Sequence, residues 1–233
     1  MALRSILARF GRSTAAVSAI EFAVIFPVLL MLLLAVGQLV LFVNATRKVQ
    51  QVATSISEML SQAVPKVTTD STATVTETDL NFSYDAALVI FPYVMADAAQ
   101  RSISWRQALT VSFAGITFNR LSTACDGNQD QSPCFVAAVN WTSTGTSSAS
   151  FRPCLPFQIP VDDSAAYSRS NLPRSLFGNG SIVAVDVTFT FNPTFGSAFL
   201  KPITITRSAF VQPRYVSRID LDTNNGVATK CLI

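Results

Sequence analysis

One stretch, residues 17–64, constrains the fold more than any other, because its pattern predicts a single long helix with two characters. From Phe22 to Val43 every residue is uncharged and nearly all are apolar, with Gln38 as the main exception. A helix of this length spans roughly 33 Å, about the thickness of a bilayer core. We therefore predict a membrane span over residues 22–43.

The second part of this stretch, residues 44–64, is amphipathic. Arg47, Lys48 and Glu58 fall on one side of the predicted helix, and Pro65 ends it. An apolar stripe on the other side is typical of a helix that packs against a soluble core. We expect this helix to join a membrane stem to a head formed by residues 65–233. The apolar stripe consists of Val49, Val52, Ala53, Ile56, Met59, Leu60, Ala63 and Val64.

The segment before the span, residues 1–16, predicts the orientation in the membrane. It contains Arg4, Arg9 and Arg12 and no acidic residue, so the positive-inside rule places it in the cytoplasm and the head on the other side. A secretory signal peptide is the alternative, since Val43-x-Ala45 satisfies a small-residue cleavage rule. The apolar run is longer than the core of such peptides, which favours a permanent single-pass span.

The pattern after the stem predicts an antiparallel sheet, because several alternating stretches follow one another without a long helix between them. One face should be apolar and covered by the amphipathic part of the stem, which makes an α+β head. Apolar residues change phase after Gly115, which indicates a bulge there. The expected strands contain Leu109 to Phe118, Phe135 to Trp141 with its odd residues on one face, Val183 to Phe191, and Ile203 to Val211.

The remaining segments of the head are less regular. Lys66 to Asp79 is rich in Ser and Thr and predicts an exposed loop, and Tyr84 to Gln100 predicts short helical turns broken at Pro92. Ser143 to Gly180 is rich in Ser, Pro and Asn. We expect a long surface excursion there, of the kind that often carries recognition.

Four cysteines, all after the stem, predict disulfides in an oxidising compartment. Three pairings are open. Locality favours one bridge between Cys125 and Cys134, around a polar loop, and a second between Cys154 and Cys231. Because the chain has neither a C-x-x-C pair nor any His, we expect no zinc site.

The sequence lacks the residues of most catalytic sites. Without His there is no Ser-His-Asp or Cys-His arrangement, and the dispersed glycines form no phosphate-binding loop, so we expect neither an enzyme nor a cofactor. A scattered net charge of +3 does not favour nucleic-acid binding. Asp126–Asp130 and Asp220–Asn224 resemble the start of a calcium loop but lack its later Gly and Glu, so we interpret them as turns.

The segment Ala15-Ala-Val-Ser-Ala-Ile-Glu-Phe-Ala-Val-Ile-Phe-Pro27, with the Leu-rich run after it, resembles the N-terminus of TadE/TadG-type proteins. These are pilin-like components of the tight-adherence (Flp-type) type IV pilus. Asn140-Trp141-Thr142, the strand ending at Asn192-Pro193, and Ser208 to Arg214 resemble later parts of the same family. The resemblance implies a bacterial inner-membrane protein with a periplasmic or extracellular head.

The resemblance also implies roles for residues near the start of the span. In pilins a prepilin peptidase removes the leader, and a Glu stands fifth in the mature chain. Glu21 is fifth if cleavage falls between Ala16 and Val17, and it would then pair with the freed amine of Val17. Ala16 replaces the usual Gly, so an uncut anchor with Glu21 at headgroup level is the alternative. Pro27 is expected to loosen or kink the helix, or to be tolerated as membrane prolines are.

These observations predict a minor pilin-like component (pseudopilin) that helps to assemble, initiate or anchor a tight-adherence pilus. Its partners would be the membrane, other pilin-like subunits, pilus-assembly membrane proteins and a prepilin peptidase. The alternative is an unprocessed, single-pass envelope protein that binds wall or surface ligands through residues 143–180.

Overall fold

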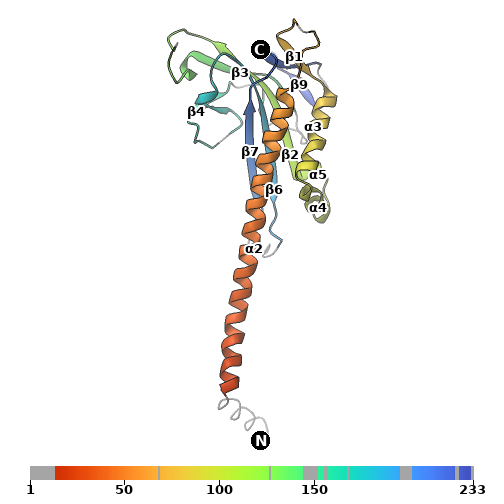
Figure 1. The fold of residues 1–233 in the computed structure, drawn as a ribbon, viewed down its shortest axis with the longest axis vertical. Coiled ribbons are helices and arrows are strands. Elements are labelled where there is room, and N and C mark those ends of the chain that lie inside the picture. Colours follow the sequence, from red (N-terminus) through yellow and green to blue (C-terminus); the bar gives the residue numbers. More distant parts are fainter. Residues whose placement is uncertain are drawn as a thin grey trace. The chain divides into compact units, whose positions relative to one another are not determined.

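The structure is a computed structural model in which the chain forms two compact units (Figure 1). One unit comprises residues 1–45 together with Pro193–Lys201, and the other comprises Thr46–Asn192 together with Pro202–Ile233. We refer to the second unit as the head. The structure describes residues 14–67, 69–125, 127–143, 152–154, 157–166, 168–194, 201–223 and 226–231.

Helix α2, Thr14–Ser61, is continuous through Pro27. Its last part lies in the head, where Val49, Val52 and Ile56 are fully buried. The helix ends three residues before Val64, because the amides of Gln62 and Ala63 bond to carbonyls three residues back, at 3.3 and 3.2 Å. Pro65 also disfavours a helical conformation at Val64. Val64 is consequently 64 % exposed rather than part of the buried stripe.

The main sheet of the head has five strands in the order β7-β6-β2-β3-β9, and every pair is antiparallel. This confirms the expected α+β fold. The four strands expected from alternation are present, and the short β9 is an addition that the pattern did not show. Their bounds are β2 Leu109–Arg120, β3 Phe135–Ser143, β6 Gly180–Phe191, β7 Ile203–Val211 and β9 Ala228–Lys230.

Both faces of this sheet are buried, which differs from the single apolar face that we expected. On the first face, Tyr84 packs on Phe113 and Phe91 packs on Phe189, each with ring centroids 5.1 Å apart. On the second face, Ile116 and its alternate neighbours join a separate apolar cluster. The change of apolar phase after Gly115 therefore marks a change of buried face. The second cluster includes Ala114, Ile116, Phe118, Phe135, Ala137, Val139, Leu172, Phe177, Ile182 and Ala184.

The bulge lies where it was expected along β2, but the extra residue belongs to β3. Gly115 pairs with Trp141 and Ile116 pairs with Val139, so Asn140 has no partner in β2. The inserted residue turns Trp141 to the face opposite Val139, and the expectation that both share one face is wrong. Gly115 makes room for the indole, since a Cβ atom there would lie 2.1 Å from Trp141 Nε1.

The helices of the head form where local signals are strong. Helix α3, Glu77–Ile90, begins with a capping box in which Thr76 and Asp79 exchange hydrogen bonds. Pro92 separates it from α4, Tyr93–Gln100, as expected. Helix α5, Trp105–Ala108, leads directly into β2.

The expectation of an exposed loop over residues 66–79 is wrong. Strand β1, Thr72–Val75, forms within it and pairs in parallel with β8, Arg218–Leu221. Ala73 and Val75 are buried in this pairing. The partner strand lies far along the chain, so the local composition of residues 66–79 did not reveal it.

Candidate functional site

The part of α2 in the first unit is an apolar helix that is largely exposed. Phe22, Met31 and Leu33 are 66, 73 and 67 % exposed, and almost none of the most apolar window is buried. Among the described residues α2 is the helix that is long and apolar enough to cross a membrane. Burial of this surface in hydrocarbon is favourable, whereas its exposure to water is not. The helix is therefore a candidate membrane anchor.

The residues proposed for processing and pairing lie in this helix. Ala16 and Val17 are within α2, Glu21 is exposed near its start, and the helix continues past Pro27. Because Pro27 has no amide hydrogen, the carbonyl of Ala23 lacks its helical partner. Cleavage, the pairing of Glu21 and a kink at Pro27 stay predictions. The basic residues Arg4, Arg9 and Arg12 lie outside the described residues.

On the second face of the sheet, the excursion after β3 forms a cover. We call its described residues, 152–154, 157–166 and 168–177, the cover segment. It contains a parallel pair of short strands, β4 Ile159–Val161 and β5 Asn171–Pro173, and the 3₁₀ turn η2, Arg174–Leu176. Leu172 and Phe177 are buried against the sheet, and the rings of Phe177 and Phe118 lie 5.2 Å apart. The excursion is therefore partly core rather than only surface. Residues 144–151 lie outside the described residues.

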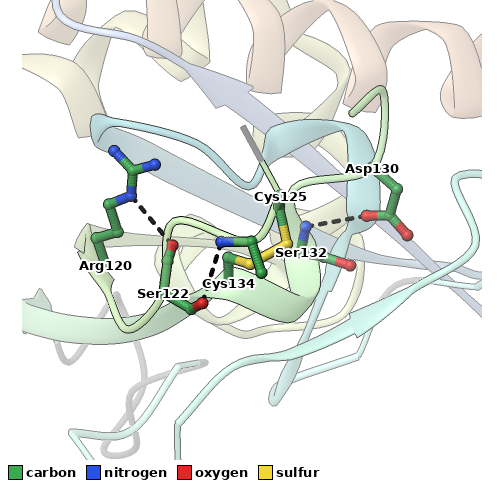
Figure 2. Close-up of a disulfide and its surroundings, with 7 residues drawn as sticks. Arg120, Ser122, Cys125, Asp130, Ser132 and Cys134 are labelled. Atoms are coloured by element: carbon green, nitrogen blue, oxygen red, sulfur yellow. Dashed lines mark hydrogen bonds between the residues drawn. A yellow bond between two sulfur atoms is a disulfide. The ribbon is translucent and has the colours of Figure 1, made fainter. Parts of the chain in front are cut away.

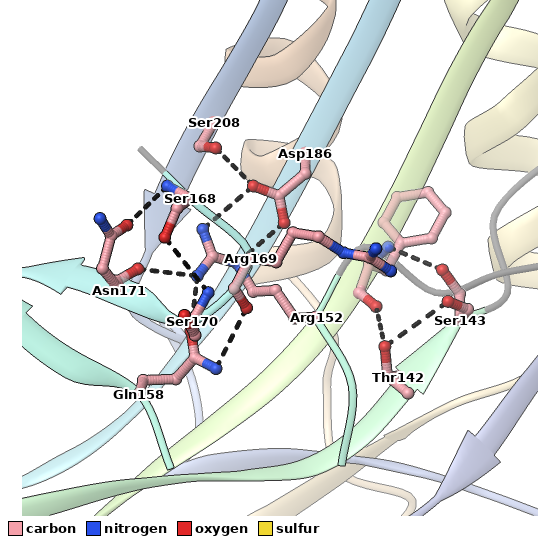
Figure 3. A network of polar contacts seen from close by, with 11 residues as sticks. Thr142, Ser143, Arg152, Gln158, Ser168, Arg169, Ser170, Asn171, Asp186 and Ser208 are labelled. Atoms are coloured by element: carbon pink, nitrogen blue, oxygen red, sulfur yellow. Dashed lines mark hydrogen bonds and ion pairs between the residues drawn. The ribbon is translucent and has the colours of Figure 1, made fainter. Parts of the chain in front are cut away.

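Arg152 holds the cover segment to the sheet (Figure 3). Its guanidinium donates from Nε to Asp186 Oδ2 at 2.8 Å and from Nη2 to Oδ1 at 3.1 Å. Nη1 donates to Gln158 Oε1 at 2.6 Å and to the carbonyl oxygen of Asn171 at 2.9 Å. The guanidinium also lies 5.2 Å from the ring centroid of Phe210. One side chain thus connects β6 and β7 with β5 and with the residue that precedes β4.

This ion pair is fully enclosed, since the side chains of Arg152 and Asp186 are 0 and 1 % exposed. Burial raises the pKa of Asp186, while the Arg152 guanidinium and the Ser208 hydroxyl, which donates to Asp186, act in the opposite direction. A buried charge pair is tolerated when its hydrogen bonds are satisfied, and it becomes costly when one partner is lost. The network therefore specifies one position of the cover segment on the sheet.

Comparisons with known proteins bear on the stem. Residues 16–56 match the family model described as TadE-like protein. The stem of this chain is TadE-like. No curated protein and no solved structure matches the chain. The matched residues cover most of α2, from the proposed cleavage position to the buried Ile56.

The match over this segment suggests involvement in the Tad pilus system. It also agrees with the anchor geometry, because the matched segment holds both the exposed apolar helix and the first turns that pack in the head. The match ends before the sheet and the cover segment, so it does not describe the surface that the head presents.

The two disulfides of the head are Cys125–Cys134 and Cys154–Cys231, which is the pairing that locality favoured. The first closes a loop of sequence separation 9, in which the Ser132 amide donates to Asp130 (Figure 2). Just before this loop, the Arg120 guanidinium donates to the carbonyl of Ser122. The second joins positions 77 residues apart. It attaches the cover segment next to β9, two residues from Arg152.

A surface hollow of about 470 Å³ lies between the first disulfide loop and the cover segment. Two of its three acidic residues are engaged by the protein: Asp130 accepts from Arg174 at 3.2 Å, and Asp163 accepts from the Ser175 amide at 3.2 Å. Hydrogen bonds from Ser132 and Arg174 hold the pKa of Asp130 below its usual value. The hollow is lined by Gln129, Asp130, Asp162, Asp163, Ser164, Arg174 and Ser175.

The carboxylates of the two calcium-like stretches are used within the head. Asp220 pairs with Arg218 at 2.7 Å, and Asp222 pairs with Lys66 at 3.2 Å. Asp126 and Asn224 lie outside the described residues. In the part of the chain that the structure describes, no group of three or more acidic, Cys or His residues is placed to hold a metal ion.

Sequence reasoning missed the Arg152–Asp186 pair. The available signal was Asp186 itself, a carboxylate in the middle of a strand whose alternate residues are all apolar. A polar alternate position is ordinary when one face of a sheet is solvated, so the pattern gave no reason to expect a buried partner for Asp186. Arg152 lies 34 residues earlier in an irregular segment, so nothing local paired the two.

Tyr84 provides a test of how the stability of the head depends on pH. Its hydroxyl is buried near Ser143 without a hydrogen bond of normal geometry to the described residues, and burial raises its pKa to about 12, opposed by Ser143 and Arg106. The folded head keeps this proton more tightly than the unfolded chain does. The raised pKa of Tyr84 contributes fully to the free energy of unfolding below pH 10. This contribution declines by about 1.4 kcal/mol per pH unit as the pH rises toward 12.

We expect Tyr84→Phe to change the free energy of unfolding little at pH 7, because it removes a buried hydroxyl that lacks a partner. At pH 11 the variant should be more stable than the wild type by roughly 1 kcal/mol. Denaturant unfolding of the detergent-solubilised chain, followed by circular dichroism, measures the difference. Parallel pH profiles of the two proteins would contradict the assignment.

Proposed function

We propose that this chain is a minor pilin-like component (pseudopilin) of a tight-adherence pilus, with a single-pass stem in the bacterial inner membrane and a disulfide-bonded head outside the cytoplasm. The observation that carries the proposal is the two-part character of α2. Its residues from Phe22 to Val43 are nearly all apolar and most of them are exposed, whereas the same helix continues as a buried element of the head. The TadE-like match over residues 16–56 supports this assignment.

The proposed role is structural rather than enzymatic. The stem anchors the subunit in the bilayer and packs against other stems when the pilus machinery assembles. In that setting Glu21 needs a positive partner, since an unpaired carboxylate in the membrane costs several kcal/mol. A prepilin peptidase would supply this partner by freeing the amine of Val17, on the same or a neighbouring subunit. Other pilin-like subunits and pilus-assembly membrane proteins are the proposed partners.

A second candidate is an unprocessed envelope protein that binds a wall or surface ligand through its head. Ala16, in place of the usual Gly before the cleavage position, favours an uncut anchor. The cover segment offers a fixed outer surface for such binding, since Arg152 and a disulfide hold it on the sheet. In this case the stem has no role in assembly beyond anchoring.

The mature N-terminus separates these candidates. For a processed pseudopilin, intact-mass analysis of the protein from membranes should give a chain that starts at Val17. A chain that retains Met1 supports the permanent anchor, and a chain that starts at Thr46 would show a secreted protein and refute both.

Glu21→Ala tests the role of the charge directly. We expect loss of pilus assembly, because the variant cannot form the pair with the Val17 amine. The head should stay folded, with both disulfides formed. Glu58→Ala is the matched control, since Glu58 is exposed on the same helix and should not affect assembly. Normal piliation of Glu21→Ala would exclude the proposed pairing.

A further inference from the structure

One end of the head gathers exposed apolar and aromatic side chains beside basic ones, and this end is defined by the strand register. Leu109 at the start of β2, Phe189 near the end of β6 and Ile205 near the start of β7 lie side by side. Phe91 packs on Phe189 with ring centroids 5.1 Å apart, which places the junction of α3 and α4 at the same end. Helix α5 lies there too, because it runs directly into β2 (Figure 1).

The part of α2 within the head shows which end this is. The carbonyl of Ser61, the last residue of α2, accepts a hydrogen bond from the Arg214 amide at 3.0 Å. Arg214 follows the end of β7, so α2 finishes at the far end of the sheet. Thr46, where α2 enters the head, therefore lies toward the end that holds α4 and α5. The residue before Thr46 belongs to the apolar helix proposed as the anchor.

Helix α4 shows an uncharged face at this end. Its one charged residue, Asp97, is 3 % exposed and pairs with Arg101 at 3.0 Å. Its exposed residues include Tyr93 and Met95, which are 36 and 56 % exposed, and Ala96 and Ala99. In water this face has no polar group beyond the Tyr93 hydroxyl and the amide of Gln100.

Aromatic and basic residues adjoin this face. Trp105 is partly exposed, and the Arg106 guanidinium lies 5.2 Å from its ring centroid. The Arg106 side chain is 45 % exposed and lies 3.7 Å from the carboxylate of Asp85, which is 65 % exposed. Ile203 at the start of β7 is 46 % exposed. We call Tyr93, Met95, Trp105, Arg106 and Ile203 the proximal rim.

We propose that the proximal rim is a second membrane contact, in which the head lies on the headgroup layer of the bilayer that holds its own stem. The inference rests on the proposed membrane anchoring, because the predicted span ends at Val43, only three residues before Thr46. A rise of about 1.5 Å per residue puts Thr46 within roughly 5 Å of the hydrocarbon boundary. Trp and Tyr favour this interfacial layer, and Arg favours its anionic headgroups.

A lipid surface suits the composition of the rim. The side chains are amphipathic: an indole, a phenol and a guanidinium are combined with aliphatic groups, as in segments that lie at the boundary between headgroups and acyl chains. The cover segment and the end of the head that holds β1 would then face away from the lipid.

The chain's two tryptophans provide the test. Trp105 belongs to the proximal rim, whereas Trp141 is 1 % exposed and bonds to the carbonyl of Ile219 in the interior of the head. The full chain is reconstituted in phosphatidylethanolamine vesicles with a minority of phosphatidylglycerol, whose acyl chains are brominated close to the headgroup. We expect bromine to quench the emission of the wild type and to leave Trp105→Phe, which reports only Trp141, nearly unchanged.

Two further variants test whether the quenching depends on the proximal rim. Met95→Glu places a charge on the rim and should reduce the quenching of Trp105, whereas Phe82→Glu, at a position 65 % exposed outside the rim, should not. Equal quenching of the wild type and Trp105→Phe, in a protein that stays in the vesicle fraction, would overturn the rim contact and leave the anchor intact. A protein that leaves the vesicles on flotation would instead refute the proposed anchoring.

Discussion

Replacement of Arg152 by Met should destabilise the head by about 3–5 kcal/mol, the cost of leaving a buried carboxylate without its partner. Asp186 is 2 % exposed, so water cannot replace the two hydrogen bonds that Arg152 supplies. Gln158 and the carbonyl of Asn171 lose a donor as well. Denaturant unfolding of the detergent-solubilised chain, with Arg152→Met beside the wild type, measures the loss.

Two controls identify the cause of that loss. Arg174→Met removes an ion pair of the same type whose side chains are 50 and 43 % exposed, and it should have a much smaller effect because solvent screens the pair. The double variant Arg152→Met with Asp186→Leu removes both charges and should recover part of the stability. A single Arg152→Met variant as stable as the wild type would show that the pair does not hold the cover segment.

Removal of the Cys154–Cys231 disulfide, with both residues changed to Ala, should cost about 4.5 kcal/mol, because the bridge closes a long loop in the unfolded chain. The separation is 77 residues, against 9 for Cys125–Cys134. The same loop-entropy estimate gives about 2.6 kcal/mol for the shorter bridge. Unfolding under non-reducing conditions, compared among the wild type and the two double-Ala variants, measures both values.

The order of the two losses is the diagnostic result. If the shorter bridge proved the more costly to remove, native packing around Cys125 and Cys134, which are buried in the second apolar cluster, would outweigh loop entropy. We also expect limited proteolysis of the Cys154–Cys231 variant to begin in the cover segment, because Arg152 would then be its main remaining attachment near that bridge.

These two predictions concern the same part of the head, the second face of the sheet. An ion pair, an apolar cluster and a disulfide together hold an otherwise irregular segment in one position. A fixed cover suits the proposed location of the head outside the cytoplasm, where a loose loop would be exposed to proteases. The disulfide also requires an oxidising compartment, which agrees with the proposed orientation.

Local sequence patterns were sufficient for much of this protein. The apolar run from Phe22 to Val43 and the stripe of 3.6-residue period after it predict one helix of two characters, because both patterns lie in consecutive residues. Alternation over Val183–Phe191 and Ile203–Val211 predicts strands for the same reason. The TadE-like resemblance also comes from a contiguous segment, residues 16–56.

The tertiary structure alone decided what depends on distant residues. Whether the polar alternate positions of β6 face water or Arg152 is set by a segment 34 residues away, and whether residues 72–75 form a strand is set by β8. The face on which Trp141 lies depends on one extra residue, Asn140, whose effect shows only against the partner strand. Burial and pairing are relations between elements, and a periodic pattern within one element specifies a face but not what covers it.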